Sequence, residues 1–167
     1  MRLNGRIAII TGAAAGLGAA TARIFAGEGA RVVLTDIDSE DGPAVAADIA
    51  RTRGDARFEM HDVSKEEDWQ RIIDHTLAAF GRIDILINNA GISGSIPDKL
   101  DLAMWDRQLS VNARGTFLGM RAVLPAMQKQ QRGAIVNISS ISGVLGQAHV
   151  HMAYNAAKGA VRSMTKA

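Results

Sequence analysis

Tyr154 and Lys158 lie four residues apart in the sequence. On a helix, that spacing places a phenol and an ammonium group on the same face, one turn apart. A positive charge about 4 Å from a phenol is worth about 4 kcal/mol at an effective dielectric near 20. Bringing the pKa of a tyrosine from about 10 toward neutrality requires a similar free energy. The pair therefore suits proton transfer, although alone such a spacing more often means a half-buried ring beside a solvated lysine.

The composition is that of one soluble globular domain. The chain has 167 residues, of which 47% are hydrophobic and 22% charged, and this length suffices for a sizeable core. The formal net charge is +2 with acids and bases interspersed, so we expect neither nucleic acid nor an anionic membrane as a partner. The absence of cysteine excludes disulfides and thiolate metal sites and fits a cytoplasmic protein. No run approaches the roughly 20 apolar residues of a membrane span.

Short apolar runs alternate with longer helical patterns along the chain. Strands are expected at residues 6–11, 31–36, 56–61, 84–88 and 134–139. Helices are expected at 16–27, from about 38 to 53, from 64 to 80, at 101–131 and from about 152 onward. This alternation predicts an α/β fold of the Rossmann type, a doubly wound parallel sheet with helices on both faces, over a single domain 1–167.

Three residue patterns predict where the helices begin or bend. Asp38 and Ser39 are candidate caps for the second helix, and residues 64–67 (SKEE) read as a capping box for the third. Pro125 should kink or split the long helix over 101–131. In a doubly wound sheet, ligands bind at the carboxyl ends of the strands, and the motifs below all fall there.

The segment between the first strand and the first helix is rich in glycine. Residues 11–18 (TGAAAGLG) allow a tight turn and let backbone N–H groups approach a pyrophosphate at the helix N-terminus. Asp36 ends the second strand, where a carboxylate would accept hydrogen bonds from an adenosine ribose and repel a 2′-phosphate. With Ile37 next and no Lys or Arg in the loop, NAD is favoured over NADP. The plainer alternatives are a flexible glycine turn and a helix cap.

Together these segments resemble the classical short-chain dehydrogenase/reductase family, from residue 3 to 167. The family pattern TGxxxGxG matches residues 11–18, its adenine-contacting Asp-Val matches Asp62 and Val63, and its Asn-Asn-Ala-Gly matches 88–91. The resemblance implies the cofactor-binding residues Gly12, Gly16, Leu17, Gly18, Asp36, Ile37, Asp62, Val63, Asn89, Ala90, Gly91, Tyr154 and Lys158.

The resemblance also implies four catalytic residues, Asn112, Ser140, Tyr154 and Lys158. Tyr154 would be the general acid or base, and Lys158 would favour its phenolate form and bind the nicotinamide ribose. Ser140 would hold the substrate oxygen, with Ser139 and Ser142 as its rivals. Asn112 would distort the helix and free a carbonyl for a proton-relay water. The bland alternatives are an exposed helix asparagine and ordinary turn serines.

The sequence departs from the family pattern in two places. Ser140 and Tyr154 are separated by one residue more than is common, in the loop at 146–152. The family also continues beyond this length with further strands and a substrate lid, and the chain stops in mid-helix without a capping signal. We therefore expect the N-terminal two-thirds of such a domain, truncated after the fifth strand. His149 and His151 are expected to line the pocket or lie on the surface, without a metal, and His61 and His75 carry no signal.

The resemblance implies hydride transfer between NAD(H) and a secondary alcohol or its ketone, from small alicyclic rings to steroid-like ones. The alternatives are a non-catalytic dinucleotide-binding module and an inactive truncated fragment. A homodimer or homotetramer is implied for the complete chain.

Overall fold

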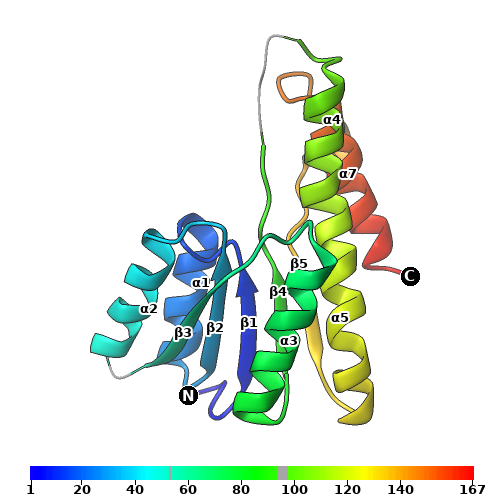
Figure 1. Cartoon of the computed structure of the whole chain (residues 1–167). Helices are drawn as coiled ribbons and strands as arrows, with labels where there is room; N and C mark the ends of the chain where they lie inside the picture. Colours follow the sequence, from blue (N-terminus) through cyan, green and yellow to red (C-terminus); the bar gives the residue numbers. More distant parts are fainter. Residues whose placement is uncertain (53, 94–97) are drawn as a thin grey trace.

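The computed structural model describes residues 1–52, 54–93 and 98–167. Five parallel strands form one sheet in the order β3-β2-β1-β4-β5 (Figure 1). Their bounds are β1 Ile7–Thr11, β2 Arg31–Asp36, β3 Asp55–Met60, β4 Ile85–Asn88 and β5 Ala134–Asn137. The predicted doubly wound parallel sheet is confirmed, with β5 ending earlier than expected.

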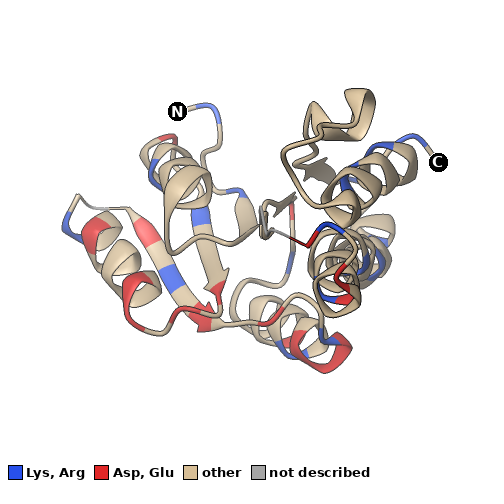
Figure 2. Ribbon diagram, turned by 90° about the horizontal axis from the view of Figure 1, so that it is seen from above, with Lys and Arg blue, Asp and Glu red and all other residues tan. Residues whose placement is uncertain are grey.

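Helices cover both faces of the sheet. Their bounds are α1 Gly16–Gly27, α2 Asp41–Arg51, α3 Glu66–Phe80, α4 Leu102–Gln108, α5 Gly115–Lys129, α6 Ser142–Leu145 and α7 Met152–Met164. Helices α1 and α2 pack on one face, and α3 and α5 pack on the other (Figures 1 and 2). Helix α7 packs against α4 and α6, and α4 projects beyond the carboxyl edge of the sheet (Figure 1).

Alternating side chains of the strands build two separate cores. Ile9 of β1 is in register with Val33 and Leu86, and all three pack with Trp69 of α3. The neighbouring Ile10 points to the other face, into a cluster with the alanines of α1. Because successive strand residues face opposite sides, a strand that is buried on both faces must be apolar throughout.

The long helix expected at 101–131 begins as predicted but is interrupted at a different place. Asp101 is the N-cap, and its Oδ1 accepts a hydrogen bond from the Met104 N–H (2.6 Å). A π-helical segment, η1 Leu109–Arg114, separates α4 from α5. Pro125 lies inside α5, which continues to Lys129. Pro125 therefore does not split the helix, while the kink expected there stays a prediction. The interruption is the wider turn around Asn112.

The expected capping box is also wrong. Lys65 is the N-cap of α3 and makes no side-chain capping bond. The Ser64 hydroxyl instead donates to Oδ1 of Asp62 (2.7 Å), back toward the loop after β3. Neither Asp38 nor Ser39 is the N-cap of α2, which is Glu40. Asp38 still satisfies donors just ahead of this helix, because its Oδ1 accepts the backbone N–H groups of Glu40 and Asp41 (both 2.9 Å).

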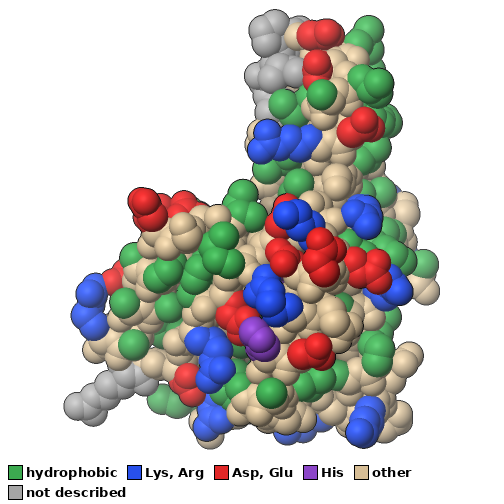
Figure 3. Space-filling view, in the orientation of Figure 1, with side chains coloured by type: hydrophobic (Ala, Val, Ile, Leu, Met, Phe, Trp, Pro, Cys, Tyr) green, Lys and Arg blue, Asp and Glu red, His purple; other side chains and the backbone are tan. Residues whose placement is uncertain are grey.

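Acidic and basic side chains are interspersed on the face formed by α3 and α5 (Figure 3). Arg121 of α5 pairs with Glu66 of α3 (2.6 Å), and Arg71 pairs with Asp68 within α3 (2.9 Å). In the described part of the chain, no helix is long and apolar enough to cross a membrane.

Candidate active site

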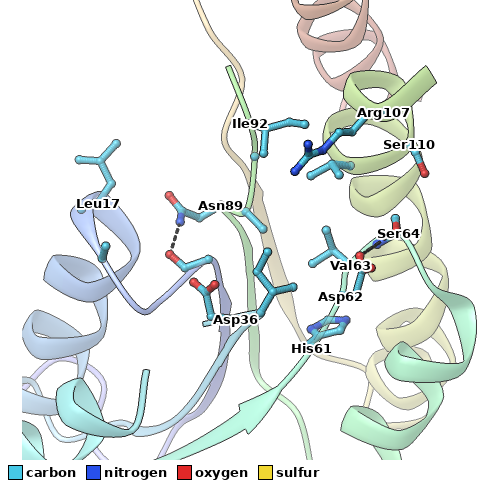
Figure 4. A pocket seen from close by; sticks show the side chains of 17 residues that line it. Leu17, Asp36, His61, Asp62, Val63, Ser64, Asn89, Ile92, Arg107 and Ser110 are labelled. Carbon is cyan, nitrogen blue, oxygen red and sulfur yellow. Dashed lines mark hydrogen bonds between the residues drawn. The ribbon is translucent and has the colours of Figure 1, made fainter. Parts of the chain in front are cut away.

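A cavity of about 630 Å³ opens at the carboxyl ends of the strands (Figure 4). It lies between β1 and β4, where the order of the parallel strands reverses, which is the usual ligand site of such a sheet. Five segments line it, namely the loop after β1 with the start of α1, the end of β2, the loop after β3, the chain after β4, and the α4–η1 stretch. The residues that line it are Gly12, Ala15, Gly16, Leu17, Asp36, Ile37, His61, Asp62, Val63, Ser64, Asn89, Ala90, Gly91, Ile92, Arg107, Ser110 and Val111.

The glycines of the first loop permit close backbone contacts. A Cβ on Gly18 would lie 2.1 Å from the Gly12 carbonyl oxygen, and one on Gly12 would lie 2.7 Å from the Ala90 Cα. Gly12 also has a φ of 63°, which favours glycine. The N-cap of α1, Ala15, makes no side-chain capping bond, so the first N–H groups of α1 are available to an anion in the cavity.

Asn89 joins the loop after β1 to the chain after β4. Its Nδ2 donates to the carbonyls of Thr11 (2.9 Å) and Gly12 (3.0 Å), and its backbone N–H donates to the Thr11 hydroxyl (3.1 Å). The Nδ2 group is therefore committed to backbone carbonyls, whereas no described residue donates to the Oδ1 atom. Asn89 shapes the wall of the cavity, and its Oδ1 remains available as an acceptor.

Asp36 is anchored by two backbone donors. Its Oδ2 accepts from the Ala14 N–H (3.0 Å) and its Oδ1 from the Asp38 N–H (3.2 Å). Each carboxylate oxygen has further acceptor capacity, and the residue lines the cavity. A hydroxyl group, such as one of a ribose, could donate a hydrogen bond to this fixed carboxylate at the end of β2.

His61 lies beneath the loop that carries Asp62 and Val63, and the sequence pattern gave it no role. Its Nδ1 shares a hydrogen bond with the Thr35 hydroxyl (2.9 Å), and its ring meets the Trp69 ring edge-on at 4.3 Å. Trp69 in turn donates to the Val63 carbonyl (2.9 Å). Burial lowers the pKa of His61 to about 4. A neutral imidazole thus links the end of β2 to the loop after β3.

Tyr154 and Lys158 both lie on α7, one turn apart, as the spacing predicts. Lys158 is only 5% exposed, and its Nζ donates to the Ile138 carbonyl (2.8 Å) at the end of β5. The Nζ atom lies 5.8 Å from the centroid of the Tyr154 ring. Burial lowers the pKa of Lys158. Lys158 is therefore held in place beside the phenol ring and is not the solvated side chain of the bland alternative.

A profile of the family described as short chain dehydrogenase matches residues 6–167. The chain belongs to this family. It is 45% identical over 167 residues to a 3-alpha-(or 20-beta)-hydroxysteroid dehydrogenase of Mycobacterium bovis and 43% identical over 167 residues to a cyclopentanol dehydrogenase of Comamonas testosteroni. These alignments cover 99% of this chain and 62% and 66% of the two relatives, so the chain spans less than two-thirds of their length.

Solved structures show the same fold. Levodione reductase is 38% identical, with a TM-score of 0.93 over 98% of this chain and 65% of that chain. A metagenomic short-chain oxidoreductase in complex with NADP is 38% identical, with a TM-score of 0.92 over 99% of this chain and 76% of that chain.

The cavity fits the nicotinamide dinucleotide that the short-chain dehydrogenase family uses. Gly12 and Gly18 have no Cβ to fill the space beside the loop, so a ligand can approach the backbone closely there. The open N-terminus of α1 suits phosphate, and Asp36 suits a ribose. The observed chemistry of the wall therefore agrees with the cofactor.

Three serines follow β5, and their hydrogen bonds distinguish them. Ser139 donates its hydroxyl to the Lys158 carbonyl (2.8 Å), and Ser142 donates to the Gln147 side chain. The Ser140 oxygen only accepts a bond, from the Ser142 N–H (3.1 Å). Among the three, Ser140 alone keeps its hydroxyl proton free of the described residues.

Asn112 lies in the π-helical segment η1 and fastens it to the chain after β4. Its Oδ1 accepts from the Ile92 N–H (3.0 Å), and its Nδ2 donates to the Ile92 carbonyl (2.8 Å). A Cβ on Gly91 would lie 2.7 Å from this Oδ1 and 3.5 Å from the Lys158 Nζ. The Asn112 carbonyl accepts the Thr116 hydroxyl (2.9 Å). Asn112 is buried and is not the exposed helix residue of the alternative.

The interpretation of His151 as a pocket-lining or surface residue is wrong. His151 is 1% exposed, and its Nδ1 accepts the Ala153 N–H (3.2 Å) as the N-cap of α7. His149 is exposed, as expected. The described residues contain no group of three His, Cys, Asp or Glu that could hold a metal.

The cavity also contains residues that the sequence patterns missed. Arg107, Ser110 and Val111 line it from the α4–η1 stretch. Their spacing of i, i+3 and i+4 marks one helical face, and this signal could have identified them. Ser140, Tyr154, Lys158 and Asn112 are not among the lining residues, although Gly91 connects the cavity to Asn112 and Lys158.

Proposed function

We propose that this chain carries the cofactor site and the proton-transfer centre of an NAD-dependent dehydrogenase that interconverts secondary alcohols and ketones. The single observation that carries the proposal is the buried Lys158 ammonium, fixed to the Ile138 carbonyl one helical turn from Tyr154. The names of the hydroxysteroid and cyclopentanol dehydrogenases support a cyclic secondary alcohol as the substrate class.

In this proposal the cavity holds the cofactor by its own polar groups. The N–H groups at the start of α1 bind the pyrophosphate, Asp36 binds the adenosine ribose, and Asp62 and Val63 bind the adenine. The Asp36 carboxylate repels a 2′-phosphate, which favours NAD over NADP. The bound nicotinamide supplies the hydride chemistry.

Side chains of this protein carry out the proton transfer. Tyr154 accepts the alcohol proton during oxidation and returns it during reduction. The Lys158 cation favours the phenolate form, and a buried cation acts more strongly than a solvated one. Ser140 donates its free hydroxyl proton to the substrate oxygen, where negative charge develops. Asn112 holds the η1 turn against Ile92 and offers a carbonyl lone pair to a relay water.

The direct test is to mix the purified chain with NAD and cyclopentanol and to follow NADH absorbance. We expect NADH to form, and cyclopentanone to be reduced in the reverse direction. We also expect NADH to bind at least about tenfold more tightly than NADPH, because the charge at Asp36 opposes the extra phosphate. Binding of NADH without turnover of any cyclic alcohol would contradict the catalytic proposal, and absence of binding would contradict the cofactor site.

A further inference from the structure

Arg107 brings a positive charge to the cavity from the wall opposite α1. Among the described residues that line the cavity, it is the only Lys or Arg, whereas Asp36 and Asp62 contribute carboxylates. Its side chain extends from α4 toward the interior of the cavity, on the side of Ile92 (Figure 4). A dinucleotide would bring two phosphate charges into a site whose glycine loop offers only backbone N–H groups.

The guanidinium of Arg107 is not committed to the protein. It makes no hydrogen bond or ion pair with the described residues, whereas two other arginines nearby are engaged. Arg114 of η1 donates to the Ser64 carbonyl (2.6 Å), and Arg121 of α5 pairs with Glu66 (2.6 Å). Arg107 is exposed, so it needs no internal partner and remains available to a ligand.

We propose that Arg107 is a further cofactor-binding residue that contacts the pyrophosphate across the cavity from the N-terminus of α1. This inference rests on the proposed function. A guanidinium presents several donors in a planar fork that matches phosphate oxygens. The pyrophosphate would thus be held between backbone N–H groups on one wall and a charged side chain on the other.

The position of Arg107 selects the pyrophosphate over the other parts of the cofactor. In Figure 4, Arg107 lies at the same end of the cavity as Leu17 and Ile92, whereas Asp36 and His61 lie at the other end. A 2′-phosphate would be expected beside Asp36 and Ile37, away from Arg107. Arg107 should therefore strengthen NAD and NADP binding equally and leave the preference between them to Asp36.

The test compares Arg107→Ala, Arg107→Lys and the control Arg162→Ala by calorimetric titration with four ligands. These are NADH, NADPH, ADP-ribose and adenosine, of which adenosine lacks the pyrophosphate. Arg162 is exposed near the end of α7 and does not line the cavity, so its replacement removes the same charge without the contact. Arg107→Lys keeps the charge but loses the planar fork.

We expect Arg107→Ala to weaken NADH, NADPH and ADP-ribose by about tenfold, the lower range for a hydrogen bond to a charged group. The affinity for adenosine should not change. For the three ligands with a pyrophosphate, the affinity of Arg107→Lys should lie between those of Arg107→Ala and the unmodified chain, and that of Arg162→Ala should equal that of the unmodified chain. The tenfold difference should shrink at 1 M salt, where the Debye length is about 3 Å.

Equal affinities of Arg107→Ala and the unmodified chain for ADP-ribose would overturn the inference while leaving the cofactor site intact. A loss that is as large for adenosine, or that is confined to NADPH, would also overturn it, because the contact would then be to adenine or to the 2′-phosphate. If the unmodified chain binds none of the dinucleotides, the proposed function fails as well.

Discussion

Burial acts in the same direction on His61 and Lys158, because removing a cation from water disfavours its charged form. The consequences differ. His61, whose pKa is about 4, is neutral at pH 7 and serves as a hydrogen-bonded spacer below the loop that carries Asp62 and Val63. Lys158 lies beside a phenol whose anionic form would stabilise its charge. The same physical effect thus yields a structural residue in one place and a candidate catalytic residue in the other.

The lowered pKa of His61 predicts a loss of stability in mild acid. An unfolded histidine binds a proton near pH 6.5, whereas folded His61 does so only near pH 4. As the pH falls through this window, the unfolded state takes up a proton that the folded state does not, so the free energy of unfolding falls. Between pH 7 and pH 5 the loss should be about 2 kcal/mol.

Urea unfolding at the two pH values measures this loss. His61→Gln should flatten the difference, whereas His149→Gln should preserve it, because His149 is exposed and makes no hydrogen bond or ion pair with the described residues. Carboxylates such as Asp68, whose pKa is lowered in the folded state, lose their contribution at more acidic pH and do not obscure the comparison. An unchanged pH dependence in His61→Gln would contradict the assignment.

At the scale of elements, the approach of α1 to the loop after β1 determines whether the cavity exists. Gly18 is buried in the first turn of α1, against the Gly12 carbonyl, whereas Gly27 ends the same helix with no described atom within 4 Å of an added Cβ. The helix therefore contains its own control, because both positions are glycine and only one is enclosed.

Gly18→Ala should destabilise the chain by about 1–3 kcal/mol through overpacking and weaken NADH binding, since α1 must move away from the loop. Gly27→Ala should change stability by less than about 1 kcal/mol and leave binding unchanged. Urea midpoints and NADH titrations of both variants test this. Equal behaviour of the two variants would show that the close contact at Gly18 does not shape the site.

For the whole molecule, the sequence predicts those features of the fold and the site that depend on a local residue pattern. Apolar runs located all five strands, and the spacing of Tyr154 and Lys158 placed both on one helix. The π turn at η1 was expected only as a distortion at Asn112, since its form depends on a long-range bond to Ile92. His61 was missed for the same reason, because its partners Thr35 and Trp69 lie in other elements. His151 was missed although its capping bond to Ala153 is local, because histidine is not among the preferred N-cap residues. The spacing of Arg107, Ser110 and Val111 indicates one helical face, but only the fold shows that this face borders the cavity.

The arrangement of the whole sheet brings the cavity and the helix of Tyr154 to the same carboxyl edge, and the proposed reaction depends on proton transfer by the phenol there. Tyr154 is the only tyrosine in the chain, so Tyr154→Phe removes the single phenolic hydroxyl. NAD-linked oxidation of cyclopentanol should fall by at least about 100-fold, while NADH affinity stays within about threefold, since one neutral hydrogen bond is worth about 1 kcal/mol or less. Unchanged turnover in Tyr154→Phe, at unchanged NADH binding, would contradict the account.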